Sequence, residues 1–108
     1  MANRPRTVVW TAASKAQLDE LIGYVARDSV VTAGKVLDVI LEAAASLSHF
    51  AERGRVVPEI RDRTIREIFV YSYRLIYEIA ASEVRIITVI HGARDFGAWL
   101  ERHGRPRS

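Results

Sequence analysis

Four stretches follow one another along the chain with almost no residues between them: GRVVPEI (54–60), TIREIFV (64–70), YRLIYEI (73–79) and VRIITVIHGARD (84–95). The last three belong to runs rich in β-branched and aromatic residues, Thr64 to Tyr71, Tyr73 to Ala81 and Val84 to His91. The gaps between these runs leave room only for tight hairpins. They therefore predict an antiparallel meander of three strands.

Upstream of the meander, the sequence predicts one strand and two helices. The β-branched run Thr7 to Trp10 predicts a strand. Ser14 to Gln17 fits a capping box at the start of a helix that ends near Arg27, and its apolar stripe consists of Leu18, Leu21, Ile22 and Val25. Asp28 or Ser29 is expected to cap a second helix from Val30 to about Ala51. The short joint makes the two helices an antiparallel hairpin.

The remaining segments are less regular. Residues 52 to 63 contain Gly54 and Pro58 and predict a loop with one short extended piece. Asp95 to His103 is expected to form either a short docked helix, capped by Asp95 and stopped by Gly104, or a tail that orders only on a partner. We expect the last residues, 104 to 108, to be frayed.

Together these elements predict an α+β fold of the order β-α-α-β-β-β, with a twisted antiparallel sheet covered on one face by the helical hairpin. At 108 residues the chain is expected to form one domain, residues 1–108, with a core from about 7 to 96 and a tail from 97 to 108.

Composition narrows the chemistry that the chain can perform. The chain has no cysteine, and its three histidines, His49, His91 and His103, are scattered, so we expect no metal and no cofactor. The N-terminus lacks an apolar run of signal-peptide length, and no stretch approaches the ~20 apolar residues of a membrane span. The expected location is the cytoplasm, away from the membrane.

Positive charge is concentrated in the second half of the chain. Residues 1–52 carry five Lys/Arg against six Asp/Glu, a net charge of −1, whereas residues 53–108 carry eleven Arg against seven Asp/Glu, a net charge of +4. Arginine binds phosphate and carboxylate bidentately. Either an anionic partner or a solvated basic face would explain this distribution.

A candidate site follows from strand alternation. A sheet with helices on one face leaves the other face open, and Arg74 is expected to point to that open face, together with His91 if the register allows. Metal-free RNA cleavage could use Glu59, Arg66, Arg74, Arg94 and His91 there. Alternatively, Arg66 and Arg74 form structural salt bridges with Glu67 and Glu78.

Two further expectations concern glycine and the aromatic residues. Gly92 is expected to take a positive φ that turns the chain off the sheet and aims Arg94. Aromatic side chains such as Tyr24, Phe69 and Tyr71 are expected to pack in the core or at its rim rather than to stack on nucleobases.

The order of elements and four short blocks resemble the RelE/ParE superfamily of bacterial toxins. These blocks are Gly54 to Glu59, Arg66 to Ile68, Tyr73 to Tyr77 and His91 to Asp95. The resemblance spans Trp10 to Phe96 and implies the toxin of a type II toxin–antitoxin module, a class associated with plasmid stabilisation and growth arrest.

The superfamily carries two activities on one fold. ParE-like members inhibit DNA gyrase, whereas RelE-like members cut mRNA in the ribosome. The ParE-like branch is favoured here because the chain has only two lysines, Lys15 and Lys35, whereas RelE relies on a lysine-rich site. Target contacts are then expected at Arg55, Arg66, Arg74 and Arg94. In the RelE-like alternative, Glu59, Arg66, Arg74 and His91 are the catalytic candidates. A third alternative is a basic RNA-binding module without toxicity.

Either toxin implies a cognate antitoxin of the ParD or RelB kind in a hetero-oligomer. Its disordered segment is expected to cover the helical hairpin, a sheet edge or the open face. The expected contacts are apolar at Val30, Val31 and Leu41 and ionic at Arg74 and Arg85.

Overall fold

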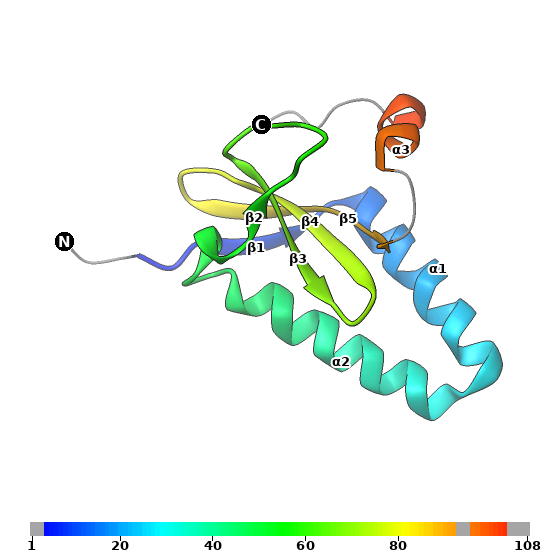
Figure 1. Ribbon diagram of the computed structural model, residues 1–108. Helices are drawn as coiled ribbons and strands as arrows, with labels where there is room; N and C mark the ends of the chain where they lie inside the picture. Colours follow the sequence, from blue (N-terminus) through cyan, green and yellow to red (C-terminus); the bar gives the residue numbers. More distant parts are fainter. Residues whose placement is uncertain (1–3, 93–95, 104–108) are drawn as a thin grey trace.

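A computed structural model describes residues 4–92 and 96–103. Five strands form one sheet, with three α-helices and one short 3-10 turn around it (Figure 1). The elements are β1 (Thr7–Trp10), α1 (Ala12–Asp28), α2 (Val30–Ser46), η1 (Ala51–Arg53), β2 (Arg55–Val56), β3 (Ile65–Val70), β4 (Tyr73–Ile79), β5 (Glu83–His91) and α3 (Phe96–His103). The predicted α+β fold, with its helical hairpin and three-stranded meander, is confirmed.

The sheet has the strand order β1-β5-β4-β3-β2 and is mixed. Strands β2 to β5 are antiparallel, as the meander predicts. The first strand differs from the prediction: β1 pairs parallel to β5, with Thr7 opposite Glu83. The helical hairpin returns the chain to the side from which β1 started, and this return makes the pairing parallel.

The predicted capping box at Ser14 is wrong because α1 begins earlier. The N-cap is Thr11, whose hydroxyl oxygen accepts a hydrogen bond from the Ser14 amide at 3.1 Å. Ser14 itself is fully buried, and its own hydroxyl donates to the Thr11 carbonyl at 2.8 Å. The apolar stripe identified the helix correctly, but Thr11 and Ser14 can both serve as an N-cap, and the sequence does not show which of them does.

Helix α2 begins as predicted and ends five residues early. Ser29 is the N-cap, and its hydroxyl oxygen accepts from the Thr32 amide. At the other end, tertiary hydrogen bonds turn the chain away from the helix axis. The Ser48 hydroxyl donates to the Arg6 carbonyl at 2.7 Å, and the Tyr77 hydroxyl donates to the Ala51 carbonyl at 2.7 Å.

A β-bulge in β5 changes which side chains share a face. Ile76 pairs with Thr88 but Tyr77 pairs with Ile86, so β5 contains one extra residue, Ile87. Beyond this point the alternation of β5 is inverted relative to a regular strand. His91 therefore pairs with Tyr73 on the face covered by α1 and α2, and the expectation that it shares a face with Arg74 is wrong.

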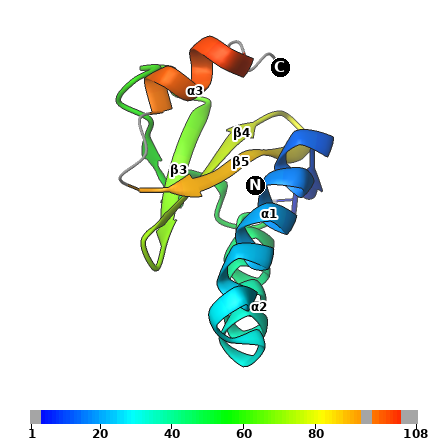
Figure 2. The same cartoon turned by 90° about the vertical axis from the view of Figure 1, so that its right-hand side faces the viewer.

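Both faces of the sheet are covered. The helical hairpin packs on one face around Ile40, Leu75 and Tyr77. Helix α3 lies on the opposite side of the sheet (Figure 2), where Phe96 and Trp99 pack against Ile76 and other buried apolar residues. The expected open face is thus closed by α3 and the loop after β2. Of the two alternatives for this segment, the docked helix is correct. Its expected cap, Asp95, and its expected stop, Gly104, lie outside the described residues, as do residues 105–108.

Two glycines allow close backbone approach. A Cβ on Gly54 would lie 2.6 Å from the Glu67 carbonyl oxygen and would overlap the Tyr77 hydroxyl. A Cβ on Gly92 would lie 2.9 Å from the Ser72 carbonyl oxygen, to which the Gly92 amide donates. The predicted positive φ at Gly92 is not observed; the residue must be small because the β3–β4 turn lies against it.

In the part of the chain that the structure describes, no helix has the length and apolar character needed to cross a membrane.

Candidate functional site

Arg74 lies at the centre of a buried ion network. Its Nε donates to Glu67 Oε1 at 2.6 Å, and its two terminal nitrogens donate to the carboxylate of Glu59 at 2.9 and 3.0 Å. Arg55 Nε donates to the other oxygen of Glu67 at 2.6 Å. The Arg74 side chain is 7% exposed and that of Glu67 is fully buried, whereas those of Glu59 and Arg55 are 32% and 59% exposed. The network therefore has a buried centre and a solvent-exposed rim.

Strand register assembles this network. Glu67 lies opposite Arg55 in the β2–β3 pair, and opposite Ile76, two residues from Arg74, in the β3–β4 pair. Period-two alternation therefore points Glu67 and Arg74 to the same face. The loop after β2 adds Glu59, and the ring of Phe96 in α3 lies 5.4 Å from the guanidinium carbon of Arg74. These elements bury Arg74 and Glu67, while Arg55 and Glu59 remain partly exposed.

The network favours permanently charged groups. The hydrogen bond from Arg74 lowers the pKa of Glu59, and the hydrogen bond to Glu59 raises the pKa of Arg74. A general acid or base works best when its pKa is near the working pH. A carboxylate with a lowered pKa and a guanidinium with a raised one are therefore suited to a structural ion pair.

Arg66 and His91 are separated from this network by the sheet. Arg66 pairs with Tyr77, on the face of the helical hairpin, and donates to the carbonyl oxygens of Gly54 and Arg63, each at 3.0 Å. His91 packs edge-on against Tyr73 with ring centroids 5.8 Å apart. The four residues expected to act together in RNA cleavage therefore do not form one cluster. Arg94 lies outside the described residues.

The salt-bridge alternative is partly correct. Arg74 does pair with Glu67 across β3 and β4, but Glu78 pairs with Arg85, which also binds Glu83. Arg66 binds carbonyl oxygens rather than a carboxylate. Arg74 and Arg85, expected as ionic anchors for an antitoxin, are therefore both engaged with carboxylates of their own chain.

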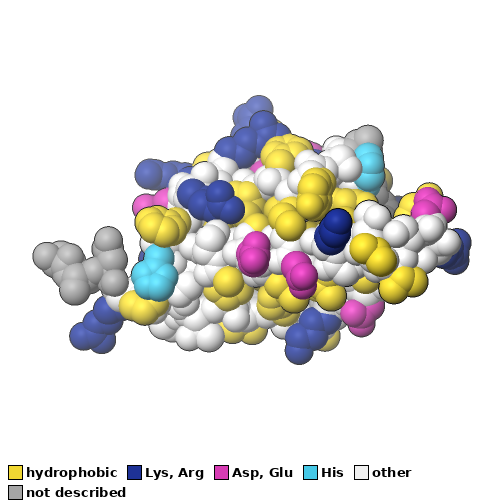
Figure 3. Space-filling model, turned by 90° about the horizontal axis from the view of Figure 1, so that it is seen from below, with side chains coloured by type: hydrophobic (Ala, Val, Ile, Leu, Met, Phe, Trp, Pro, Cys, Tyr) yellow, Lys and Arg dark blue, Asp and Glu magenta, His cyan; other side chains and the backbone are white. Residues whose placement is uncertain are grey.

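The helical hairpin exposes apolar side chains to solvent. Val30 is 76% exposed, Val31 70% and Leu41 42%. Leu41 also lines a hollow of about 290 Å³ together with Trp10, Lys15, Leu18 and Asp19. Seen from below, hydrophobic side chains lie among a few charged ones across this surface (Figure 3). These are the residues expected to contact an antitoxin, and they are accessible.

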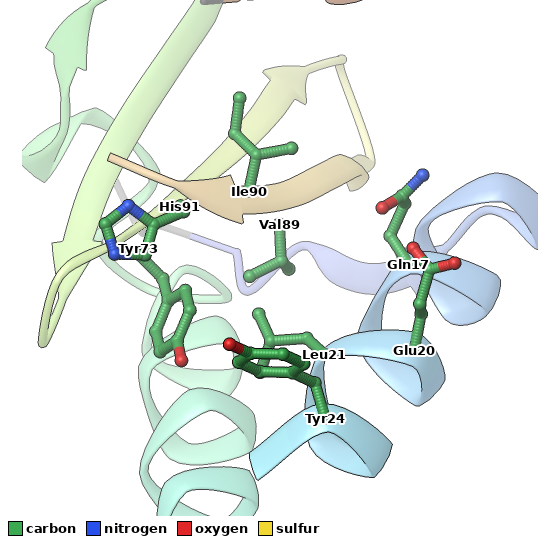
Figure 4. A pocket seen from close by; sticks show the side chains of 8 residues that line it. All are labelled: Gln17, Glu20, Leu21, Tyr24, Tyr73, Val89, Ile90 and His91. Atoms are coloured by element: carbon green, nitrogen blue, oxygen red, sulfur yellow. The ribbon is translucent and has the colours of Figure 1, made fainter. Parts of the chain in front are cut away.

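A second hollow, which we call the tyrosine pocket, opens between α1 and the β4–β5 pair (Figure 4). Its volume is about 240 Å³. Its lining comes from both elements and comprises Gln17, Glu20, Leu21, Tyr24, Tyr73, Val89, Ile90 and His91.

Three aromatic residues expected to pack are exposed instead. Tyr24 is 71% exposed, Phe69 55% and Tyr71 62%. Tyr24 lies off the apolar stripe of α1, so the sequence held a signal for its exposure. Phe69 shares the strand parity of Ile65 and Glu67, which are both buried, so strand alternation does not predict its exposure. Tyr71 has a φ of 55° in the β3–β4 turn, a strained conformation for a bulky residue. Arg55 lies with its guanidinium carbon 5.4 Å from the Phe69 ring.

No group of three or more His, Cys, Asp or Glu residues that could hold a metal ion occurs within residues 4–92 and 96–103.

Comparisons with solved structures agree with this architecture. The chain resembles a structure described as the chromosomal ParDE TA system from P. aeruginosa, with a TM-score of 0.67 and 20% identity over 82% of this chain and 97% of the other. It also resembles the toxin–antitoxin complex RelBE2 from Mycobacterium tuberculosis, with a TM-score of 0.56 and 24% identity over 81% of this chain and 98% of the other. These likenesses establish the fold, which is that of the RelE/ParE toxins.

Sequence comparison gives the family. The model described as "ParE toxin of type II toxin-antitoxin system, parDE" matches residues 8–96. Toxin RelE2 of Caulobacter vibrioides is 33% identical over 88 residues, which cover 81% of this chain and 96% of the relative. The chain belongs to the ParE toxin family within the RelE/ParE superfamily, and it is the toxin of a type II toxin–antitoxin system.

Proposed function

We propose that this toxin is a ParE-like inhibitor of DNA gyrase, silenced by a cognate antitoxin of the ParD kind. The observation that supports the proposal is the state of Arg74, whose side chain is 7% exposed and whose guanidinium makes three hydrogen bonds to Glu59 and Glu67. A ribonuclease needs its cationic and acid–base groups on one accessible surface. Here Arg66 and His91 lie on the opposite face of the sheet.

Target binding requires accessible groups, and the described residues offer them around the β3–β4 turn. Phe69 and Tyr71 are exposed there, and Arg55, whose side chain is 59% exposed, stacks on Phe69. Exposed aromatic and arginine side chains held in one geometry are common among residues that dominate binding energy. We propose this turn as the contact surface for the gyrase–DNA complex.

The test is a plasmid supercoiling assay with gyrase and toxin that has been purified free of antitoxin. We expect loss of supercoiling and accumulation of cleaved, protein-bound DNA. The double variant Phe69→Thr/Tyr71→Asn should lose this activity, and asparagine tolerates the positive φ of Tyr71 better than tyrosine does. The control is Phe50→Ser, which removes another exposed aromatic, 65% exposed, directly before η1. Unchanged supercoiling by protein that still arrests growth would contradict the proposal.

The alternative is a RelE-like endoribonuclease that depends on the ribosome. The observation in its favour is the likeness to the relative named RelE2, which covers most of both chains. Under this alternative, toxin added to programmed ribosomes would cut the mRNA, and His91→Gln would slow the cleavage. Growth arrest with neither activity would contradict both hypotheses.

The antitoxin is proposed to cover the exposed apolar residues of the helical hairpin. Val30, Val31 and Leu41 are exposed apolar side chains that the antitoxin could cover. In hydrogen exchange, α1 and α2 should gain protection when the cognate antitoxin is added. Val31→Ser should weaken the affinity for the antitoxin. Lys35→Gln, at an exposed position of the next turn of α2, should change this affinity little. Unaltered exchange in both helices would contradict this placement.

A further inference from the structure

We propose that the tyrosine pocket binds an arginine side chain of a partner protein. The pocket's volume, about 240 Å³, lies below the ~300–1,000 Å³ of typical small-molecule sites. It is large enough for one long side chain. Its occupant is therefore better sought among the residues of a bound protein than among free metabolites.

The walls of the pocket fit a side chain that is apolar along its stem and polar at its tip. Leu21 and Val89 form an apolar floor (Figure 4). In Figure 4 the side chains of Tyr24 and Tyr73 lie on one side of this floor, and Gln17 and Glu20 project from α1 on the other. An arginine buries its methylene groups on such a floor while its charged end stays at the polar rim.

The charge of the lining selects a cation. Glu20 is the only carboxylate among the eight lining residues, and none of them is lysine or arginine. Within the part of the chain that the structure describes, no salt bridge to Glu20 is found. The carboxylate thus remains available for a cation brought by a partner. Residues 1–52, which include α1, also carry a net charge of −1.

The tyrosine rings favour a guanidinium over an ammonium group. A guanidinium is planar, stacks on aromatic rings and can bind a carboxylate with two parallel hydrogen bonds. The chain already places one guanidinium near this wall: the guanidinium carbon of Arg27 lies 6.0 Å from the centre of the Tyr24 ring. The Tyr24 ring thus already lies close to one cation. Arg27 is not among the residues that line the pocket, so it leaves the pocket open to a partner.

The experiment is a titration of isotope-labelled toxin, monitored by NMR, with a capped alanine peptide that carries one central arginine. The same peptide with citrulline is the matched probe, since citrulline has nearly the shape of arginine and no charge. We expect shift changes confined to the pocket residues, and an affinity for the arginine peptide at least about fivefold above that for the citrulline peptide. A lysine peptide should bind more weakly than the arginine peptide.

Two variants locate the interaction. Glu20→Gln should reduce the affinity for the arginine peptide to that of the citrulline peptide. Asp19→Asn, which removes the adjacent exposed carboxylate of the same helix, should leave the affinity within about twofold of the starting protein, because Asp19 lines the other hollow.

Three results would overturn the proposal: equal binding of the arginine and citrulline peptides, equal effects of the Glu20 and Asp19 substitutions, or no response to the arginine peptide. The measurement needs neither gyrase nor antitoxin, so its outcome is independent of the proposed gyrase inhibition.

Discussion

The two faces of the sheet are both closed, but by different chemistry. The face under α1 and α2 is packed with hydrocarbon, and its one deeply buried phenol, Tyr77, donates to the Ala51 carbonyl and accepts from the Gly54 amide. The face under α3 holds a smaller apolar cluster beside the ion network of Glu59, Arg74, Glu67 and Arg55. Two of the charged residues singled out in the sequence, Glu59 and Arg74, are thus paired with each other, and exposed apolar side chains lie instead on the helical hairpin and around the β3–β4 turn.

The strongest test of this comparison is Arg74→Met. Removing the guanidinium leaves the fully buried Glu67 with only the partly exposed Arg55, and we expect a loss of about 3–5 kcal/mol in the free energy of unfolding. Urea denaturation measures it. Arg63→Met, on an exposed loop residue, is the control and should change stability by less than about 0.5 kcal/mol. Equal effects would mean that the network is not structural.

A second test uses Gly54, whose backbone lies against Tyr77 of the apolar cluster under α1 and α2. Gly54→Ala should destabilise the fold by about 2–3 kcal/mol because the new Cβ would overlap the Tyr77 hydroxyl and lie 2.6 Å from the Glu67 carbonyl oxygen. Gly34→Ala, in α2, meets no atom within 4 Å and should stabilise it by about 1 kcal/mol. The two melting curves should shift in opposite directions. A shared direction would show that backbone approach at Gly54 is not limiting.

The hydrocarbon face can be probed through its phenol. Tyr77→Phe removes the hydroxyl that donates to the Ala51 carbonyl and accepts from the Gly54 amide. Both backbone groups then lose this hydrogen-bond partner. We expect a loss of about 1–2 kcal/mol by urea denaturation, smaller than the loss at Arg74 because no charge is stranded. Tyr71→Phe, at an exposed position, serves as the reference. A larger loss of unfolding free energy for Tyr77→Phe than for Arg74→Met would mean that the buried ion network contributes less to stability than the single phenol.

The smallest effect concerns pH. Because the pKa of Glu59 is lowered in the folded state, its ionised form contributes stability above the ordinary pKa of 4.5, and this contribution is lost as the pH falls through the folded value. Glu59→Gln should therefore cost roughly 1 kcal/mol at about pH 7, and this cost should shrink as the pH falls through the folded pKa of Glu59. A difference between the two proteins that persists in acid would assign the effect to packing rather than charge.

The sequence predicted the elements better than the site. Every long element was located by the apolar stripes of α1 and α2 and by the three β-rich runs. These patterns are predictive because apolar residues recur with the period of the face that an element buries. Ends were less predictable: tertiary hydrogen bonds from Ser48 and Tyr77 ended α2 before Ala51. Two placements could not be predicted: the extra residue Ile87 in β5 decides the face of His91, and the register of β3 decides the face of Arg66. A single-residue bulge leaves no mark in composition, yet it moved His91 to the other face.

The exposure of apolar side chains was the other property that the sequence predicted only in part. Val30, Val31 and Leu41 were expected at an apolar interface and are indeed accessible, because they extend the stripe of α2 beyond what one sheet can cover. Phe69 and Tyr71 were expected to pack and do not. Hydrophobicity alone does not reveal whether an aromatic residue near a turn points into the molecule or away from it.

The pairing of β1 with β5 also has a consequence for the synthesis of this toxin. Thr7 meets Glu83, so β1 cannot find its neighbour until β5 has left the ribosome. Contacts between residues so far apart in sequence form late, because closing a long loop is entropically costly. The helical hairpin can form early as a local unit, but the complete sheet can form only after β5 has been synthesised. A truncated chain that stops before β5 should accumulate as an incomplete fold with its first strand unpaired.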